Sequence, residues 1–310
     1  MADAIRISAP ATSANLGPGF DVLALALDLS NDVVVTRRPG PLEVRVTGEG
    51  AGEIPEDETN LVCRALARGL GTDRLSDLVV ECHNRIPLGR GLGSSAAAIC
   101  SGFVAANALA VLRWAPDDLL ARAAEMEGHA DNVGACVYGG IVAVGPGTRT
   151  IQFPVPDEML FVAVIPTGRV STEQARSVLP DAVSPADVRA NLARAVGLAV
   201  ALERGDLDDL PLLLVDRLHE PYRASLVPGL ELLRAMVGSD GCHGATISGS
   251  GPSVLLWCDR SDAARLASAA ETALAAAGIA ASAKVLRVAP GGVRCRWVDA
   301  TDTRLAKAVG

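Results

Sequence analysis

The sequence predicts an α+β protein made of two domains. Strand and helix patterns mix along the 310 residues without strict alternation, which is typical of the α+β class. Hydrophobic residues make up 49 % of the chain, enough for a sizeable core, but the aromatic share is only 3 %, so alanine, valine and leucine fill that core. The stretch GPGTRTIQFPVPDE (145–158) places three prolines and two glycines between strand-like segments. We therefore expect one domain at 1–154 and a second at 155–310.

Alternating and β-branched runs predict the strands of the first domain, and helical periodicity predicts its helices. The strands are expected at 5–9, 31–38, 42–47, 78–85 and, as a strand or a hairpin, at 136–145. The helices are expected at 59–71, from about 95 to 112, and at 115–128. Gly71 and Gly128 are suited to end the first and the last of these helices, and Pro116 suits the first turn of the last.

The second domain opens with the apolar run MLFVAVIP (159–166), which predicts a buried strand. Further strands are expected on either side of a glycine turn within 243–258 and, as the final strand of the chain, at 281–289. Helical patterns occur at 171–179, 185–204, 206–220, near 229–238, and at 261–278, where Ser261 and Gly278 are suited to cap the helix.

Charge and cysteine content argue against several classes of protein. The formal net charge of −8 disfavours nucleic acid and an anionic membrane as partners. The seven cysteines are an odd number without a Cys-x-x-Cys pair, which disfavours a zinc ribbon or a thioredoxin-like site. The N-terminal residues lack the basic start and apolar core of a signal peptide, and the apolar run 96–112 predicts a buried helix rather than a membrane span. We therefore expect a cytoplasmic protein with reduced cysteines.

The stretch PLGRGLGSSAAA (87–98) suggests a phosphate site. Its glycines let backbone N–H groups approach an anion, and the free N–H groups at the start of the following helix favour phosphate. No lysine is present in this loop, and the only lysines of the chain are Lys284 and Lys307, so the helix end and a metal would have to supply the positive charge. The hydroxyls of Ser94 and Ser95 could contact phosphate or a metal shell. By itself, the stretch is equally consistent with an ordinary serine-capped helix after a glycine turn.

Two further stretches of small residues, PATSANLGPGFD (10–21) and ISGSGPSV (247–254), each lie next to a strand signal. Three such stretches in one chain predict backbones that converge on one ligand. Together they resemble the three motifs of the GHMP kinases, a family of small-molecule kinases for galactose, homoserine, mevalonate and phosphomevalonate. The strings EGHADNV (127–133), VSTEQAR (170–176) and EPYRASLVPG (220–229) resemble the branch that phosphorylates homoserine in particular.

This resemblance implies both an architecture and a reaction. The N-terminal domain would be similar to domain 2 of ribosomal protein S5, the C-terminal domain would be ferredoxin-like, and the nucleotide would lie between them. The reaction would be the phosphorylation of the hydroxyl of L-homoserine by ATP with Mg²⁺, giving O-phospho-L-homoserine and ADP in threonine biosynthesis. Relatives are commonly dimers, so a homodimer is expected.

The resemblance also implies a nucleotide site and a metal site. Asn60 would contact the nucleotide base, with a helix N-cap as the alternative role for this residue. Ser94 and Glu125 would hold Mg²⁺. Glu125 and Glu127 point to different faces of one helix, so at most one of them faces the metal, and Glu127 is the alternative. The phosphates would lie along Pro87, Leu88, Gly89, Arg90, Gly91, Leu92, Gly93, Ser94, Ser95, Ala96 and Ala97.

On the acceptor side, Arg176 and Arg223 match arginines of the family that would clamp the carboxylate of homoserine. The other contacts implied by the resemblance come from Asn15, Asp21, His129, Asn132 and Thr172. Asn132, Arg176 and Asp21 are the candidates for catalytic roles. Mevalonate and galactose kinases pair a catalytic aspartate with a basic residue, but this chain has PATSAN where that basic residue would sit. Positioning and charge neutralisation are therefore expected to dominate over base catalysis.

Two alternatives stay open. Another GHMP kinase that acts on a small hydroxy acid such as pantoate would also need a carboxylate clamp. A non-catalytic protein of the same fold would bind a nucleotide or a metabolite and regulate a partner. An eroded phosphate loop or a missing metal carboxylate would indicate this second alternative, and the sequence shows neither.

Overall fold

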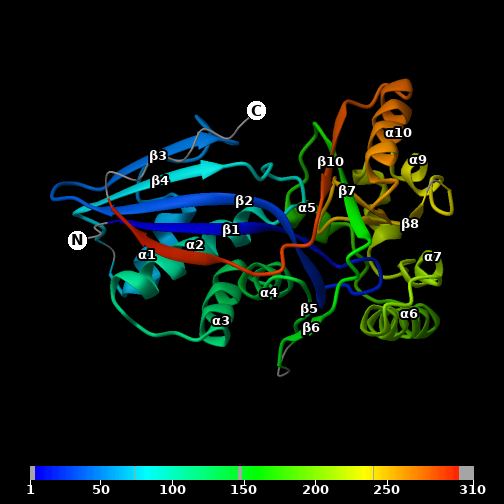
Figure 1. Cartoon of the computed structure of the whole chain (residues 1–310), viewed down its shortest axis with the longest axis horizontal. Coiled ribbons are helices and arrows are strands. Elements are labelled where there is room, and N and C mark those ends of the chain that lie inside the picture. Colours follow the sequence, from blue (N-terminus) through cyan, green and yellow to red (C-terminus); the bar gives the residue numbers. More distant parts are fainter. Residues whose placement is uncertain (1–3, 73, 146–148, 240, 300–310) are drawn as a thin grey trace.

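The computed structural model describes residues 4–72, 74–145, 149–239 and 241–299, which form two β-sheets flanked by helices (Figure 1). The first sheet has the strand order β11-β1-β2-β4-β3, and β5 extends it by pairing with β2 and β6. Only β3 and β4 pair in parallel among the described strands of this sheet. Its strands are β1 (Ala4–Ala14), β2 (Leu23–Arg37), β3 (Glu43–Gly48), β4 (Leu78–Asn84), β5 (Ile141–Ala143), β6 (Ile151–Phe153) and β11 (Arg294–Val298).

Four helices lie on one side of the first sheet in Figure 1. They are α1 (Leu61–Leu70), α2 (Ser94–Leu109), α3 (Pro116–Glu127) and α4 (Asp131–Tyr138). The middle of α2 is buried on all sides, because it packs against α1, α3, α4 and strand β1. Its run of alanines keeps the helix thin enough for these neighbours to approach it closely.

The second sheet is antiparallel throughout, with the order β10-β7-β9-β8. Its strands are β7 (Met159–Pro166), β8 (Cys242–Ile247), β9 (Val254–Asp259) and β10 (Ala281–Leu286). Helix α10 packs against β10 and β7 of this sheet. The helices of this half are α5 (Thr172–Ser177), α6 (Pro185–Arg204), α7 (Leu210–Leu213), α8 (Glu220–Arg223), α9 (Leu230–Arg234) and α10 (Ala263–Ala276), and a 3₁₀ turn follows α8 at Ala224–Leu226.

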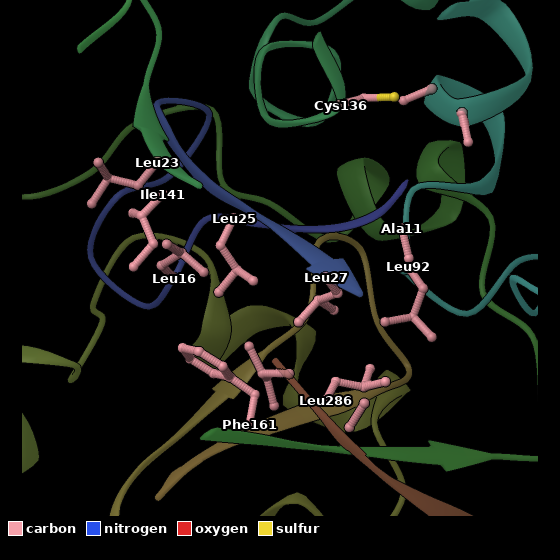
Figure 2. Close-up of a cluster of buried hydrophobic side chains, with 14 of the residues drawn as sticks. Ala11, Leu16, Leu23, Leu25, Leu27, Leu92, Cys136, Ile141, Phe161 and Leu286 are labelled. Carbon is pink, nitrogen blue, oxygen red and sulfur yellow. The ribbon is translucent and has the colours of Figure 1, made fainter. Parts of the chain in front are cut away.

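One hydrophobic core joins the two sheets. Figure 2 shows Leu25 and Leu27 of β2 pointing toward Phe161 of β7 and Leu286 of β10. Phe161 and Trp257 stack edge to face, with ring centroids 5.0 Å apart. Because burial of such side chains removes apolar surface from water on both sheets at once, the core fixes the loops at the ends of the sheets relative to one another.

Most predicted elements are present, and the helix at 185–204 has the predicted bounds. Asn60 and Gly71 cap α1, and Gly128 caps α3 in the left-handed conformation. The predicted cap at Ser261 is wrong, because Asp262 is the N-cap of α10 and makes no side-chain cap bond. The helical pattern at 206–220 forms only the short α7 and the start of α8.

Two differences follow from tertiary packing. The strand or hairpin predicted at 136–145 begins instead as the last part of α4, and only Ile141–Ala143 is a strand. Here packing against β1 and β2 overrides the strand preference of Val137 and Tyr138. The strand near 281–289 is not the last one, because β11 returns to the first sheet and pairs with β1. Four of its five residues are exposed, so it carries no clear hydrophobic signal. The chain passes from the first sheet to the second between Phe153 and Met159, and the division at 154 stays a prediction.

Six of the seven cysteines are buried free thiols, and Cys295 is exposed. In the part of the chain that the structure describes, no helix is both long and apolar enough to span a membrane.

Candidate active site

A cavity of about 510 Å³ is lined by segments from both halves of the chain. These segments are the loop after β1, the residues around the start of α1, the loop before α2, the α3–α4 connection, α5 with the residues before it, α8, and the β8–β9 loop. The predicted site residues on its wall are Asn15, Asp21, Asn60, Pro87, Leu88, Gly89, Arg90, Gly91, Leu92, Gly93, Ser94, Ser95, Glu127, His129, Asn132, Thr172, Arg176 and Arg223. The structure thus brings the three small-residue stretches to one place.

The glycines of the loop before α2 are required by close backbone contacts. A Cβ atom on Gly93 would lie 1.8 Å from the hydroxyl oxygen of Thr12, and one on Gly91 would lie 2.0 Å from the carbonyl oxygen of Ser248. Both glycines also have positive φ angles, 68° and 71°. Gly93 is the N-cap of α2 and has no side chain, so the first N–H groups of the helix face the cavity without a capping group. This arrangement suits an anion without help from a lysine.

Arg90 does not act as a free cation in this loop. Its guanidinium donates to the carbonyl oxygens of Pro166 (2.8 Å), Leu88 (3.0 Å) and Thr167 (2.5 Å). The carbonyl of Gly89 also accepts from the N–H of Val170. The loop is therefore fastened to the end of β7, and the helix end stays the main source of positive potential for an anion.

On another part of the cavity wall, Asp21 and Arg176 form a two-pronged ion pair. The Arg176 Nη1 and Nη2 atoms lie 3.0 and 3.1 Å from the two carboxylate oxygens of Asp21, and both side chains are more than one third exposed. Asn15 holds the loop behind Asp21, since its amide oxygen accepts from the Asp21 N–H and its amide nitrogen donates to the carbonyl of Gly249. Asn15 and Asp21 both have positive φ angles, 75° and 54°. Backbone strain of this kind often marks functional loops.

Arg223 is a buried cation whose guanidinium is held on three sides. Its Nε donates to the carbonyl of Ala175 (3.1 Å), and its Nη1 donates to the carbonyl of Gly249 (3.1 Å) and to Nδ1 of His219 (3.2 Å). Burial lowers its pKa. Among the described residues Nη2 has no acceptor, and the side chain lines the cavity. This nitrogen is thus left to bind a ligand.

His219 helps to orient the Arg223 guanidinium, and its two hydrogen bonds require a single tautomer of the imidazole ring. Its Nε2 lies 3.0 Å from the carbonyl oxygen of Gly17, which can only accept, so Nε2 carries the proton. Its Nδ1 accepts from Arg223, which can only donate. Burial lowers the pKa of His219 to about 4, and the nearby guanidinium of Arg223 lowers it as well, so the ring is neutral near pH 7. A neutral ring is the form that can accept from Arg223.

The loop that carries His219 and Arg223 is anchored by Asp216. The Oδ2 atom of its buried carboxylate accepts from the backbone N–H groups of Leu218, His219 and Glu220, and Oδ1 accepts from the side-chain amide of Asn191 on α6. The same amide donates to the carbonyl of Pro18. This network connects α6 to the loop that contains Asp21.

Acidic and polar groups from the α3–α4 connection face the phosphate loop. The Glu127 carboxylate accepts from the hydroxyl of Ser95 (2.5 Å) and lies 3.8 Å from Nε2 of His129. Burial raises the pKa of Glu127 above its usual value. His129 makes a 2.8 Å contact with Asp131, which raises the pKa of this histidine. The Asn132 side chain accepts from the hydroxyl of Thr12 (2.7 Å), which ties this connection to β1.

Three predicted site residues, Glu125, Ala96 and Ala97, do not line the cavity. Glu125 lies outside the cavity, with 69 % of its side chain exposed and its carboxylate 2.7 Å from Arg68, so the prediction that it faces the phosphate loop is wrong. Its position on the helix turns it toward α1, whereas Glu127 at the helix end is turned inward. Ala96 and Ala97 are fully buried beneath the loop and do not line the cavity. Asn60 is the N-cap of α1, with its oxygen 2.9 Å from the N–H of Val62, and it also lines the cavity.

Several residues that shape the site had no sequence prediction. Thr12 and Ser248 touch the phosphate loop from the two other small-residue stretches: the Thr12 N–H donates to the carbonyl of Leu92, and the Ser248 hydroxyl donates to the carbonyl of Gly91. The repeated glycine and serine pattern was the available signal for them. His219 and Asp216 act behind the cavity wall, and no sequence pattern distinguishes them from structural residues.

Comparisons with known proteins agree with this geometry. The family described as GHMP kinases N terminal domain matches residues 60–140, and the family GHMP kinases C terminal matches residues 198–276. The chain belongs to the GHMP kinase family. Its fold is therefore the two-domain fold of these kinases, as the sequence predicted.

This GHMP kinase is similar to homoserine kinases over most of its length. It is 42 % identical to the homoserine kinase of Streptomyces avermitilis over 297 residues, which cover 93 % of this chain and 97 % of the relative. It is 46 % identical to the homoserine kinase of Mycolicibacterium smegmatis over 263 residues, covering 79 % and 82 % of the two chains. The crystal structure of homoserine kinase from Cytophaga hutchinsonii superimposes with a TM-score of 0.85 at 32 % identity, covering 96 % of this chain and 98 % of the other.

We predict that Glu127→Gln lowers the kcat of this kinase by about 100-fold or more, because it removes the buried carboxylate that would hold Mg²⁺ beside the phosphate loop. Glu125→Gln is the matched control, since Glu125 is exposed and points away, and it should change kcat less than twofold. Steady-state kinetics with both variants test this expectation. Burial raises the pKa of Glu127, so this carboxylate is protonated at a higher pH than that of an ordinary glutamate. When the pH is lowered, wild-type activity should therefore begin to fall at a higher pH than it would if Glu127 had its usual pKa. Equal effects of the two substitutions would contradict this assignment.

We also predict that His219→Leu raises the KM for the phosphoryl acceptor about tenfold and leaves the KM for ATP unchanged, because Arg223 loses one of its three anchors. His219→Gln should recover part of the loss, since an amide can donate to Gly17 and accept from Arg223. Thermal melting of both variants separates a fold defect from a site defect. A parallel rise of both KM values would show that His219 serves the fold as a whole.

Proposed function

We propose that this kinase transfers the γ-phosphoryl group of ATP to the hydroxyl of L-homoserine, giving O-phospho-L-homoserine and ADP in threonine biosynthesis. The observation that carries the proposal is the Asp21–Arg176 ion pair, which lines the same cavity as the phosphate loop and the free nitrogen of Arg223. The similarity to homoserine kinases over most of the chain supports the same substrate.

The ion pair offers one anion and one cation side by side, which matches the two charges of an α-amino acid. An incoming zwitterion can exchange partners with the pair, so that its ammonium group binds Asp21 and its carboxylate binds Arg176. The Nη2 atom of Arg223 adds donors for the carboxylate. Each protein charge keeps an opposite charge beside it during this exchange, which limits the cost of desolvation.

ATP would place its phosphates at the start of α2, over the backbone of 91–95. The oxygen donors of Ser94 and of the buried carboxylate of Glu127 fit the preference of Mg²⁺, and the metal would neutralise charge on the phosphates. We assign the carboxylate role to Glu127 in place of Glu125 because only Glu127 faces the cavity. The amide oxygen of Asn60 caps the N–H of Val62 and its amide nitrogen donates one hydrogen to the carbonyl of Pro55, so the second amide hydrogen would be the group that contacts the nucleotide base.

The residues of this chain would act mainly by positioning. Asp21, Arg176 and Arg223 would hold the two charged ends of homoserine, and Asn15 and Asn132 would orient the loops around it. His129, Thr172 and the helix end would then surround the transferred group with donors. Phosphoryl transfer passes through a loose transition state, so this alignment and charge neutralisation can supply most of the rate enhancement without a strong base.

The alternatives are less well matched to the cavity. A hydroxy acid such as pantoate lacks an ammonium group and would leave Asp21 without a cation once Arg176 binds the carboxylate. A non-catalytic sensor would not need a buried carboxylate at the phosphate loop, and this chain has Glu127 there. We further propose that the kinase acts in the cytoplasm and as a homodimer.

The test is an acceptor panel with Mg²⁺ and ATP, in which ADP release is followed with L-homoserine, D-homoserine, pantoate and mevalonate offered one at a time. We expect turnover with L-homoserine and less than about 1 % of that kcat/KM with the others, since each misplaces or lacks a charged group. Turnover with pantoate alone would replace the proposed substrate by a hydroxy acid. ATP binding without turnover of any acceptor would favour the sensor.

A further inference from the structure

Two connecting segments, one from each half of the chain, form walls of the cavity on either side of the phosphate loop. The first connects β3 to α1, and its residues Ile54 and Pro55 line the cavity. The carbonyl of Pro55 also accepts from the side-chain amide of Asn60. The second connects β7 to α5, and its residues Val170 and Ser171 line the same cavity. A nucleotide in this cavity would therefore be enclosed by one wall from each half.

A bidentate ion pair joins these two segments. The Nη1 and Nη2 atoms of Arg169 lie 2.5 and 3.1 Å from the two carboxylate oxygens of Glu53, although the residues are 116 positions apart in the sequence. Glu53 comes directly before Ile54, and Arg169 comes directly before Val170. The two side chains are 55 and 47 % exposed and do not line the cavity, so the pair lies at its rim. Two parallel bonds between a guanidinium and a carboxylate fix direction as well as distance.

The phosphate loop lies against both of the joined segments. A Cβ atom on Gly89 would lie 3.4 Å from the side chain of Arg169, so this arginine packs on the loop from one side. A Cβ atom on Gly50 would lie 2.3 Å from the side chain of Leu88 and 2.7 Å from that of Ile54, so the β3–α1 segment packs on the loop as well. The ion pair thus joins the two segments beside positions 88 and 89, shortly before the backbone that is proposed to hold the phosphates.

We infer that Glu53 and Arg169 form a clasp across the rim of the cavity, which holds a bound nucleotide in place and slows the release of ADP. This role rests on the proposed function, because it requires a nucleotide between Asn60 and the start of α2. While the ion pair is formed, the two walls cannot separate at this point. An exposed ion pair contributes little to stability, which suits a contact that has to break in every catalytic cycle. Both residues are positioning residues, since neither reaches the transferred group.

The rate of ADP release tests the clasp. Each protein is loaded with Mg²⁺ and the fluorescent ADP analogue mant-ADP, and displacement by excess ADP is followed by stopped-flow fluorescence. Glu53→Gln and Arg169→Gln should each raise the dissociation rate constant about three- to fivefold, because each breaks the same exposed ion pair. The double variant should release mant-ADP no faster than the single variants, since all three lose one and the same interaction.

Glu49→Gln is the matched control for the loss of a carboxylate. Glu49 is an exposed residue of the same β3–α1 segment and makes no ion pair with any residue that the structure describes. Its substitution should change the dissociation rate constant by less than about 1.5-fold. Thermal melting checks that each variant is folded as stably as the wild type.

Ionic strength supplies a readout that a purely structural role would not change. Between about 50 and 500 mM NaCl, the ratio of the double-variant to the wild-type rate constant should fall toward one, because salt screens exposed charges. Equal rate constants in the wild type and both single variants, or single effects that multiply in the double variant, would overturn the clasp and leave the nucleotide site intact. A wild-type chain that does not bind mant-ADP would overturn the nucleotide site and the clasp together.

Discussion

The contact on which the site depends is the approach of three backbones around the phosphate loop. Gly93 comes so close to Thr12, and Gly91 so close to Ser248, that no side chain could be added at either glycine. Ser248 follows β8 in the second sheet, and Thr12 belongs to β1 in the first. The loop is therefore wedged between the two domains, and the continuous core below it prevents them from separating without loss of apolar burial. A helix end that is fixed in this way can bind an anion without reorganising.

A second set of buried polar groups holds the acceptor side in the same manner. Asp216 gathers three backbone N–H groups, His219 joins Gly17 to Arg223, and Asn191 ties this loop to α6. Apart from the Nη2 atom of Arg223, which is left for a ligand, the polar groups named here are hydrogen-bonded, and such a network is rigid in a medium of low dielectric constant. The network therefore holds the Arg223 guanidinium in one orientation on the cavity wall.

The sequence was most informative where one residue type is required by local geometry. Glycines at helix ends predicted the caps of α1 and α3, and the spacing of glycine and serine in 87–98 predicted the loop that begins α2. The sequence was less informative where contacts with residues distant in the chain determine the secondary structure. The end of α4 has the composition of a strand but is held as a helix by β1 and β2, and β11 pairs at a sheet edge with mostly exposed residues.

The site residues also fall into two groups, those that local sequence reveals and those whose roles depend on contacts in the folded chain. The resemblance found the residues that line the cavity, because they lie in recognisable strings. It did not show that Glu127 lines the cavity and Glu125 does not, since that difference depends on where α3 ends and on the pairing of Glu125 with Arg68. His219 and Asp216 escaped notice for a related reason. Their roles arise from burial and from partners such as Gly17 and Asn191, which only the folded chain brings near.

The central claim is that Asp21 binds the ammonium group of the acceptor and does not remove a proton from its hydroxyl. The most direct test is to measure kcat and KM of Asp21→Asn with L-homoserine at saturating ATP. Loss of a charged hydrogen bond should raise the KM by roughly 10- to 100-fold while kcat stays within a few-fold of wild type. A kcat reduced by several orders of magnitude at an unchanged KM would contradict the account, because Asp21 would then be the catalytic base.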